Sequence, residues 1–310
     1  SAALSLKYLK PDFYCKGKDY KNIKDDTTGE IKNEIRALKK IKGKIIFTEE
    51  LTFSSSRLIN LHTDFYNPKQ KRILKKINKI SNFKEIKKQI DRLSDLKILV
   101  IGETIIDQYN FCEVLGKSGK EPMLTFKETK KQQYLGGVLS IARNVSQFSN
   151  HVTVLSMIGE KKEYLKDIKK NLSKKIKTKF IYKEGSPTIV KKRYIDDISQ
   201  NKLMGIYNIN DEKLKKNDET KFNKMLQHYI KKNDLVIVSD YGHGLISKKS
   251  ANYICRYSKF LALNAQVNSS NIGFHTIRNY SKFNTLVINE KEIRHEVRDN
   301  VSKLEILMSK

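Results

Sequence analysis

Cysteines, long apolar runs and arginines are all scarce in this sequence of 310 residues. Cys15, Cys112 and Cys255 are far apart and odd in number, which argues against a disulfide framework and against a CxxC redox or zinc pair. Unpaired cysteines of this kind indicate the reducing cytoplasm. The chain has no run of about 18 apolar residues and no signal-peptide core at its start, so we expect no transmembrane helix and no membrane partner.

Arginine supplies only ten of the 62 basic residues, although the formal net charge is +28. Such a charge raises the alternative of a nucleic-acid binder, whose affinity for DNA would fall steeply with salt. Specific nucleic-acid sites concentrate arginine and aromatic side chains on one face, whereas these lysines are spread along the whole chain. The composition therefore predicts a solvated lysine surface and no nucleic-acid partner.

Three motifs of well-known catalytic sites are also missing. The segment at 116–120, "GKSGK", resembles a P-loop, but Phe111 stands where that motif needs a glycine. No GxGxxG follows the first apolar strand, which disfavours a dinucleotide-binding fold. The six histidines are scattered and form no HExxH, so zinc catalysis is not expected.

From residue 95 onward, continuous apolar runs alternate with helical patterns. The runs are "LKILVIG", "HVTVLSMIG", "DLVIVSD", "KFLALNAQ" and "NTLVIN". The helical patterns cover 137–149, 162–172, 211–232, 247–258 and 290–309. Apolar runs of this kind are typical of parallel strands buried on both faces, and the alternation predicts a doubly wound α/β sheet.

Three further segments, around 123–129, 188–195 and 202–208, alternate apolar and polar residues. This period of two is typical of half-exposed strands and differs from the buried runs. We expect these segments to form a small β lid over a site.

The first 94 residues show a different organisation. Residues 1–60 predict a small α/β piece, with strands at "PDFYCKG" and "GKIIFT" and a helix between them. Residues 61–94 are rich in lysine and have apolar residues every three to four positions. This spacing predicts an amphipathic helical linker whose apolar stripe is packed.

Polar residues follow several of the predicted strands, at the edge where open α/β sheets bind ligands. They are Glu103, Asp107, Asp240, Asn264, Gln266 and Asn289. Several such residues on one edge predict a site for a polyhydroxylated or phosphorylated ligand with a metal. The pair Gly136–Gly137 opens a predicted helix, which is explained either by a tight turn or by a backbone that approaches a ligand closely.

Five segments resemble, in order, the ribokinase-like (PfkB-type) sugar kinases. They are "KILVIGETIIDQY", "YLGGVLSIARN", "PTIVKKRYID", "VIVSDYGHG" and "VINEKE", and the resemblance covers roughly residues 95–300. It is strongest to heptose-phosphate kinases and their nucleotidyltransferase fusions. The resemblance implies ATP- and Mg²⁺-dependent phosphorylation of a sugar or sugar phosphate, for nucleotide-sugar synthesis. The alternative is a non-catalytic sugar- or nucleotide-binding module that retains the kinase fold.

The resemblance assigns the sugar side of the site. Asp107 matches the aspartate that binds sugar hydroxyls, and Gly136 and Gly137 match the double glycine whose backbone meets them. Asn144 matches a second sugar contact, whereas Ser140 stands where the family often has asparagine. A short carboxylate can accept two hydroxyl hydrogen bonds, which suits a vicinal diol.

The resemblance also assigns the phosphate and metal side. Lys192 and Arg193 would meet a sugar phosphate from the lid, and Asp240 would lie at the nucleotide. Asn289 and Glu292 match an NxxE motif that organises Mg²⁺ and phosphate. Since Mg²⁺ keeps much of its water, one carboxylate acting through water is enough. A homodimer formed through the lid is also expected.

The first 60 residues are similar to the closing half of cytidylyltransferase-like nucleotidyltransferases. Ser54, Ser55 and Ser56 would hold nucleotide phosphates at a helix start, with added charge from Lys16. The alternative for the serines is a simple helix cap.

Neither resemblance is complete in this sequence. The HxGH motif of the nucleotidyltransferases and the GAGD motif that carries the kinase base are both absent. We therefore expect three parts: residues 1–60 from a nucleotidyltransferase, a linker at 61–94, and a sugar kinase at 95–310 without its catalytic segment. A chain lacking the base is expected to show no kinase turnover.

Overall fold

The computed structural model describes residues 2–17, 20, 30–48, 66–267 and 275–309. The chain divides into two compact units, Ser1–Asn82 and Phe83–Lys310. Each unit is described by itself. The division falls inside the linker expected at 61–94, and the expected limits of the three parts stay a prediction.

The first unit contains a parallel pair of strands with a helix between them. Helix α1 covers Ala2–Leu9, β1 Phe13–Gly17, α2 Ile31–Lys40 and β2 Lys44–Thr48, and β1 pairs with β2 in parallel. The spacing of Glu34, Ala37 and Leu38 turns one face of α2 inward. Leu6, Ala37 and Leu38 form a small core, so this unit has the strand–helix–strand order that its sequence predicts.

Helix α4, Pro68–Ile80, follows in the first unit and has no buried residue. Its apolar side chains Ile73, Leu74, Ile77 and Ile80 are all exposed. The sequence predicted an amphipathic helix here with a packed stripe. The helix is present, but its stripe is not packed in the described part of the chain.

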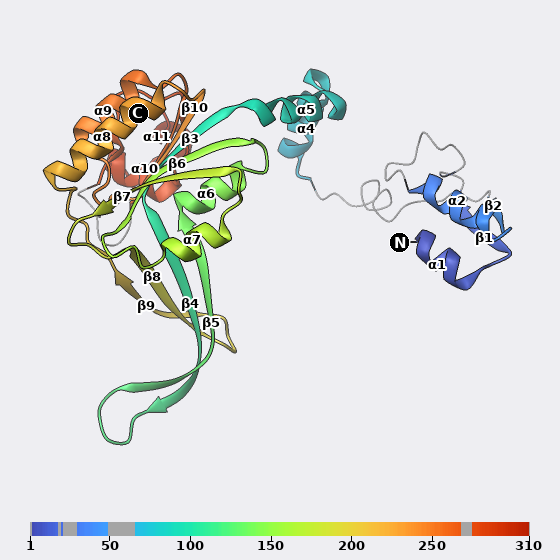
Figure 1. Ribbon diagram of the computed structural model, residues 1–310, viewed down its shortest axis with the longest axis horizontal. Helices are drawn as coiled ribbons and strands as arrows, with labels where there is room; N and C mark the ends of the chain where they lie inside the picture. Colours follow the sequence, from blue (N-terminus) through green and yellow to red (C-terminus); the bar gives the residue numbers. More distant parts are fainter. Residues whose placement is uncertain (1, 18–19, 21–29, 49–65, 268–274, 310) are drawn as a thin grey trace. The chain divides into compact units, whose positions relative to one another are not determined.

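The second unit is built on a parallel sheet of six strands among its described residues, in the order β12-β11-β10-β3-β6-β7. The strands are β3 Lys97–Gly102, β6 His151–Gly159, β7 Ile176–Lys183, β10 Leu235–Asp240, β11 Leu261–Ala265 and β12 Thr285–Leu286. All neighbours pair in parallel. The predicted parallel α/β sheet is confirmed (Figure 1).

Helices cover both faces of this sheet. On one face, α8 (Lys216–Ile230) and α9 (Lys248–Tyr257) bury Phe222, Leu226 and Ile254. On the other, α6 (Val138–Val145) and α7 (Leu165–Asn171) bury Leu139 and Ile168. This two-sided burial explains why the strands β3, β6 and β10 are continuous apolar runs.

Two elements differ from the sequence expectation. Strand β7 was not expected, because its lysines alternate with apolar residues and only some of its residues are buried. The helix expected over 290–309 is two helices, α10 (Glu290–Val297) and α11 (Leu304–Leu307). Arg298 ends α10 with a left-handed φ of 52°, which an α-helix cannot continue through. The short helices α5 (Phe83–Asp91), η3 (Arg92–Asp95) and η4 (Ile277–Asn279) complete the unit.

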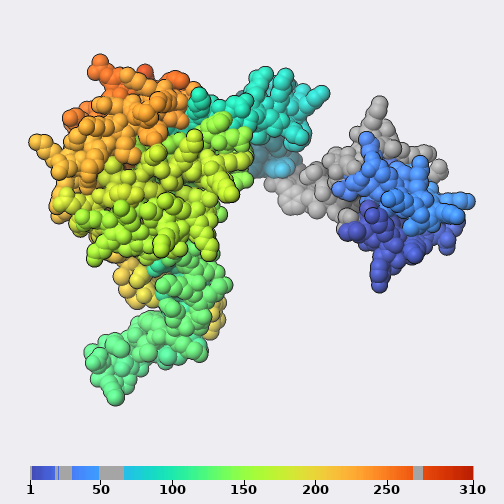
Figure 2. Space-filling model, viewed as in Figure 1, coloured from blue at the N-terminus to red at the C-terminus, as the bar shows by residue number. Residues whose placement is uncertain are grey.

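A second sheet forms the lid. Its described strands have the order β5-β4-β8-β9, with β4 at Thr104–Lys117, β5 at Leu124–Gly137, β8 at Ile189–Asp196 and β9 at Lys202–Asn208. The three segments predicted as a lid are confirmed as strands outside the main sheet. The sequence missed β4, and it missed that β5 continues to Gly137. The β4–β5 hairpin projects from the body of the second unit (Figure 2).

We expect Phe222→Ala to lower the free energy of unfolding by about 3–5 kcal/mol, because the Phe222 side chain of α8 is fully buried in the core against the sheet. Phe148→Ala is the matched control, since Phe148 is 52% exposed, and it should change stability by less than about 0.5 kcal/mol. Denaturant unfolding followed by circular dichroism measures both. Equal losses in the two variants would contradict the core described here.

Candidate functional site

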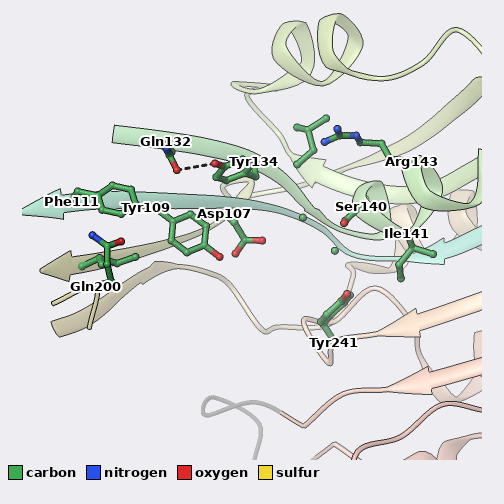
Figure 3. A pocket seen from close by; sticks show the side chains of 14 residues that line it. Asp107, Tyr109, Phe111, Gln132, Tyr134, Ser140, Ile141, Arg143, Gln200 and Tyr241 are labelled. Atoms are coloured by element: carbon green, nitrogen blue, oxygen red, sulfur yellow. Dashed lines mark hydrogen bonds between the residues drawn. The ribbon is translucent and has the colours of Figure 1, made fainter. Parts of the chain in front are cut away.

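A cavity of about 690 Å³ lies where the lid meets the start of α6. Strands β4 and β5 supply most of its wall, α6 supplies Ser140, Ile141 and Arg143, and the loop after β10 supplies Tyr241 (Figure 3). The remaining lining residues are Asp107, Tyr109, Phe111, Gln132, Tyr134, Leu135, Gly136, Gly137, Ile195 and Gln200. The cavity is therefore polar and aromatic, which is typical of sites that hold hydrophilic ligands.

The chain passes from the main sheet to the lid at Glu103. Strand β3 ends at Gly102 in one sheet and β4 begins at Thr104 in the other. This switch explains the position of Asp107, because the fourth residue after Glu103 lies on the lid just beyond the carboxyl edge of the main sheet. Polar strand ends at that edge were expected to form a site, and Asp107 lines the cavity.

The two glycines have separate structural reasons. A Cβ on Gly136 would lie 2.1 Å from Oδ2 of Asp107, so the carboxylate lies where a side chain at 136 would be. Gly137 has a φ of 57° and precedes α6, and a Cβ there would lie 2.3 Å from the carbonyl oxygen of Glu103. Gly136 thus permits a close approach, and Gly137 supplies the turn.

Asp107 forms an ion pair with Arg193 of β8. The Arg193 guanidinium donates to Oδ1 at 2.5 Å, and both side chains are 22% exposed. The guanidinium also lies over the ring of Tyr109, 5.5 Å from its centroid. The arginine expected on the lid is therefore brought to the predicted sugar-binding aspartate.

Lys191, not Lys192, shares this face of the lid. In the parallel pairing of β4 with β8, Asp107 is opposite Lys191 and Tyr109 is opposite Arg193. Lys192 is opposite Gln108, so it points to the other face, because side chains alternate along a strand. Lys192 was expected at the sugar phosphate, and the structure does not bring it to Asp107.

The Lys191 side chain is almost fully buried in this wall. It is 9% exposed, and burial lowers the pKa of its ammonium group, an effect that the nearby charge of Asp107 opposes. A buried cation beside a cavity favours an anionic ligand. The sequence run "KKR" indicated the residue type, but it did not show which lysine faces inward.

Two buried carboxylates lie beneath the cavity. Glu103 accepts backbone hydrogen bonds from Tyr241 at 2.9 Å and His243 at 3.2 Å. Burial, and then the charge of Asp240, raise the pKa of Glu103 to about 8, although the hydrogen bond from the Tyr241 amide favours the charged form. Asp240 accepts from the Tyr280 hydroxyl at 2.7 Å and from the Gly242 amide at 3.0 Å.

Asp240 was expected at the nucleotide. It is 2% exposed and both of its oxygens already accept hydrogen bonds, so the structure buries it at the end of β10 rather than on an open surface.

The buried histidine His243 also supports this loop by pairing with Asp211. This pair was not predicted from the sequence. His243 Nδ1 lies 2.6 Å from Oδ1 of Asp211, and burial lowers the pKa of the imidazole. Its Nε2 is buried without a hydrogen-bond partner among the described residues. Lys183 donates to the carbonyl oxygens of Asn210 at 2.6 Å and His243 at 3.2 Å. Asp211 and His243 are too far apart in the sequence for a motif to connect them.

Asn289 and Glu292 form a reciprocal capping box at the start of α10. The Asn289 side chain accepts from the Glu292 amide at 2.9 Å, and Glu292 Oε2 accepts from the Asn289 amide at 3.0 Å. Glu292 Oε1 makes no such bond among the described residues. One carboxylate oxygen thus fits a Mg²⁺ ion held through water. The described ranges contain no group of three or more His, Cys, Asp and Glu side chains placed to hold a metal directly.

One further predicted sugar contact does not line this cavity, and the predicted nucleotide contact Lys16 belongs to the first unit. Asn144 is exposed on α6 and does not line the cavity, whereas its neighbour Arg143 does. Lys16 lies in the first unit, where its ammonium group pairs with Glu34 at 2.8 Å and lies over the Tyr20 ring. Its charge is therefore already neutralised. Ser54, Ser55 and Ser56 lie outside the described residues.

Comparison with known sequences gives distant relatives, and no family model matches the chain. "Bifunctional protein HldE" of Koribacter versatilis (strain Ellin345) is 24% identical over 59% of this chain and 37% of its own length. The HldE protein of Campylobacter jejuni (strain RM1221) is 26% identical over 63% of this chain and 40% of its own length. "D-beta-D-heptose 7-phosphate kinase" of Bordetella bronchiseptica is 22% identical over 51% of this chain and 49% of its own length. The chain thus spans about two fifths to half of these relatives.

Comparison with solved structures agrees on the fold. The tetrameric inhibited form of phosphofructokinase-2 from Escherichia coli matches with a TM-score of 0.51 and 8% identity, over 69% of this chain and 68% of that one. The same enzyme in complex with potassium matches with a TM-score of 0.50 and 8% identity, over 69% and 67%. The chain has a ribokinase-like sugar kinase fold and is distantly homologous to HldE.

The raised pKa of Glu103 makes stability depend on pH. Between its ordinary value of 4.5 and about 8, the folded state holds a proton that the unfolded state releases. This stabilisation is complete below pH 4.5 and is lost as pH rises through about 8. We expect the Tm of the parent, relative to Glu103→Gln, to fall over this range. The control variant Glu121→Gln changes an exposed carboxylate, so its Tm should depend on pH as that of the parent does. Curves of Tm against pH that run parallel for the parent and Glu103→Gln would contradict the prediction.

Proposed function

We propose that the second unit binds a phosphorylated sugar for ATP-dependent phosphoryl transfer, with a heptose phosphate as the representative substrate. The observation that carries this proposal is the Asp107 carboxylate, held against the bare backbone of Gly136 and lining the cavity under the lid. The distant homology to HldE and to a heptose 7-phosphate kinase supports the same substrate class.

The cavity offers the contacts that a sugar needs. Asp107 can accept hydrogen bonds from two neighbouring hydroxyls, and Gly136 leaves room for a ring to approach it. The rings of Tyr109 and Tyr134 lie edge to face with centroids 5.7 Å apart, and they give an apolar wall for the C–H face of the sugar. Gln132, which accepts from the Tyr134 hydroxyl at 2.8 Å, and Ser140 of α6 add polar groups (Figure 3).

The cations around the cavity suit a phosphate on that sugar. Arg193 and Lys191 lie on the face of Asp107, and Arg143 reaches the cavity from α6. Guanidinium groups bind phosphate through paired N–H donors, so Arg143 and Arg193 provide specific contacts and Lys191 a point charge.

ATP and Mg²⁺ belong to the same proposal. When bound, Mg²⁺ would supply charge neutralisation for the transferred phosphoryl group. Glu292 would hold it through water, with its orientation set by the capping box with Asn289. Asp107 would orient the sugar, and the lid would exclude water from the reacting phosphate. No described residue is assigned as the base.

A nucleotidyltransferase role for the first unit is part of the proposal. Its support is the parallel β1–β2 pair joined through α2 and the word "bifunctional" in the names of the HldE relatives. Lys16, already paired with Glu34, would have to exchange that partner for a nucleotide phosphate.

We expect Asp107→Asn to weaken binding of heptose 7-phosphate by at least about tenfold, because a neutral amide loses charge-assisted hydrogen bonds to the hydroxyls. Glu113→Gln is the matched control: it changes a carboxylate to an amide on the same strand, and Glu113 is exposed and pairs only weakly with Lys127, at 3.6 Å. Isothermal titration calorimetry measures both affinities. Unchanged affinity in Asp107→Asn, with its fold intact, would refute the sugar site.

The lid also supports a homodimer. All residues of β9 are exposed, including Leu203, Met204 and Ile206, and β9 is an edge strand of its sheet. An exposed apolar edge strand favours pairing with a second chain. We expect Ile206→Lys to convert a dimer to a monomer in sedimentation, while Val301→Lys, at a site 95% exposed away from the lid, leaves the dimer intact. A monomeric parent would contradict this arrangement.

A further inference from the structure

Helix α4 in the first unit is folded by its own sequence rather than by packing. Asn67 caps it: its side chain accepts from the Gln70 amide at 2.9 Å, and Gln70 returns a bond to the Asn67 amide at 2.8 Å. Pro68 occupies the first helical position, where its missing N–H costs nothing. No residue of α4 is buried, so packing within the described part of the first unit does not account for the helix.

The two faces of α4 differ sharply. At a period of 3.6 residues, Ile73, Ile77 and Ile80 lie in one row with Leu74 beside it, and these side chains are 48%, 43%, 83% and 41% exposed. The rest of the circumference carries the basic residues Lys69, Lys71, Arg72, Lys75, Lys76 and Lys79. Residues 68–80 contain no acidic side chain. The helix therefore presents an apolar row bordered by basic side chains, with no acidic residue in its own sequence.

We propose that α4 is an interfacial helix that binds the surface of an anionic lipid bilayer. Such a surface is the one partner that satisfies both faces: acyl chains take the isoleucine row, and lipid phosphates take the lysines. A second copy of α4 would bring its basic side chains against those of the first, which opposes a contact between copies at this helix. A nucleic acid would neutralise the lysines but leave the isoleucine row in water.

The dimensions of α4 suit a helix that lies on a membrane. Its 13 residues give a length of about 20 Å at 1.5 Å per residue. Lys69 and Lys76 border the apolar row, where long lysine stems can lie along the acyl boundary with their ammonium groups at the phosphates. Among the described residues, no helix has the length and apolar content that crossing a bilayer requires. The expectation of no membrane partner rested on spanning segments, and this surface contact is a different mode.

The test is vesicle binding by the full chain. We expect it to sediment with phosphatidylcholine vesicles that contain phosphatidylglycerol, to stay in solution with phosphatidylcholine alone, and to lose binding as salt is raised. Ile73→Glu/Ile77→Glu should lower the partition coefficient at least about tenfold, because two apolar side chains no longer enter the bilayer. Neither residue is buried, so the circular dichroism spectrum should not change.

Matched charge variants separate this site from the general lysine surface. Lys75→Gln/Lys76→Gln/Lys79→Gln should weaken binding to anionic vesicles strongly. The triple variant Lys166→Gln/Lys169→Gln/Lys170→Gln removes the same charge from exposed positions on and beside α7, and should have little effect. Equal effects of the two triple variants would overturn the proposal, as would unchanged binding in Ile73→Glu/Ile77→Glu. Binding to a DNA duplex through the α4 lysines, with none to anionic vesicles, would overturn it in favour of nucleic acid.

Discussion

The contact between the Gly136 backbone and the Asp107 carboxylate organises the rest of the site. It exists because position 136 has no side chain, and any Cβ there would overlap the carboxylate. Through this contact the end of β5 is held against β4, and the next residue, Gly137, begins α6. Asp107 in turn holds Arg193 of β8. One missing side chain thus allows three lid strands and a helix to meet at a single carboxylate.

Charge is arranged in layers around that carboxylate. Arg143 lines the cavity, Arg193 pairs with Asp107, and Lys191 lies opposite Asp107 on β8, while Glu103 and Asp240 are buried. Burial and the charge of Asp240 favour a proton on Glu103, as its raised pKa indicates. When Glu103 is protonated, the buried carboxylates carry less negative charge. The electrostatic potential near Asp107 is then set mainly by Arg193, Lys191 and Arg143. Such a field favours an anionic ligand such as a sugar phosphate.

The sequence predicted the parts of this molecule whose patterns are local. The runs of β3, β6 and β10 were recognisable because both of their faces are buried. Strand β7 was not, because its lysines break the apolar run.

The rest depended on tertiary contacts. Because side chains alternate along a strand, Lys191 and Lys192 of β8 must point to opposite faces. Only the pairing of β8 with β4 shows that Lys191 shares the face of Asp107. The partnership of Asp211 with His243 joins segments that no motif connects. Helical periodicity revealed the two faces of α4, but it did not show that the apolar one is exposed.

In the capping box of α10 the two carboxylate oxygens of Glu292 have different roles. Oε2 accepts from the Asn289 amide and holds the first turn of the helix, while Oε1 is left for another partner. If a ligand drew both oxygens away, the helix would lose the Glu292 half of its capping box, while the Asn289 side chain could still cap the Glu292 amide. Ligand affinity at Glu292 and the fraying of α10 are therefore thermodynamically linked. A ligand that needs only one carboxylate oxygen would leave the start of α10 intact, whereas one that needs a bidentate carboxylate would compete with the capping box.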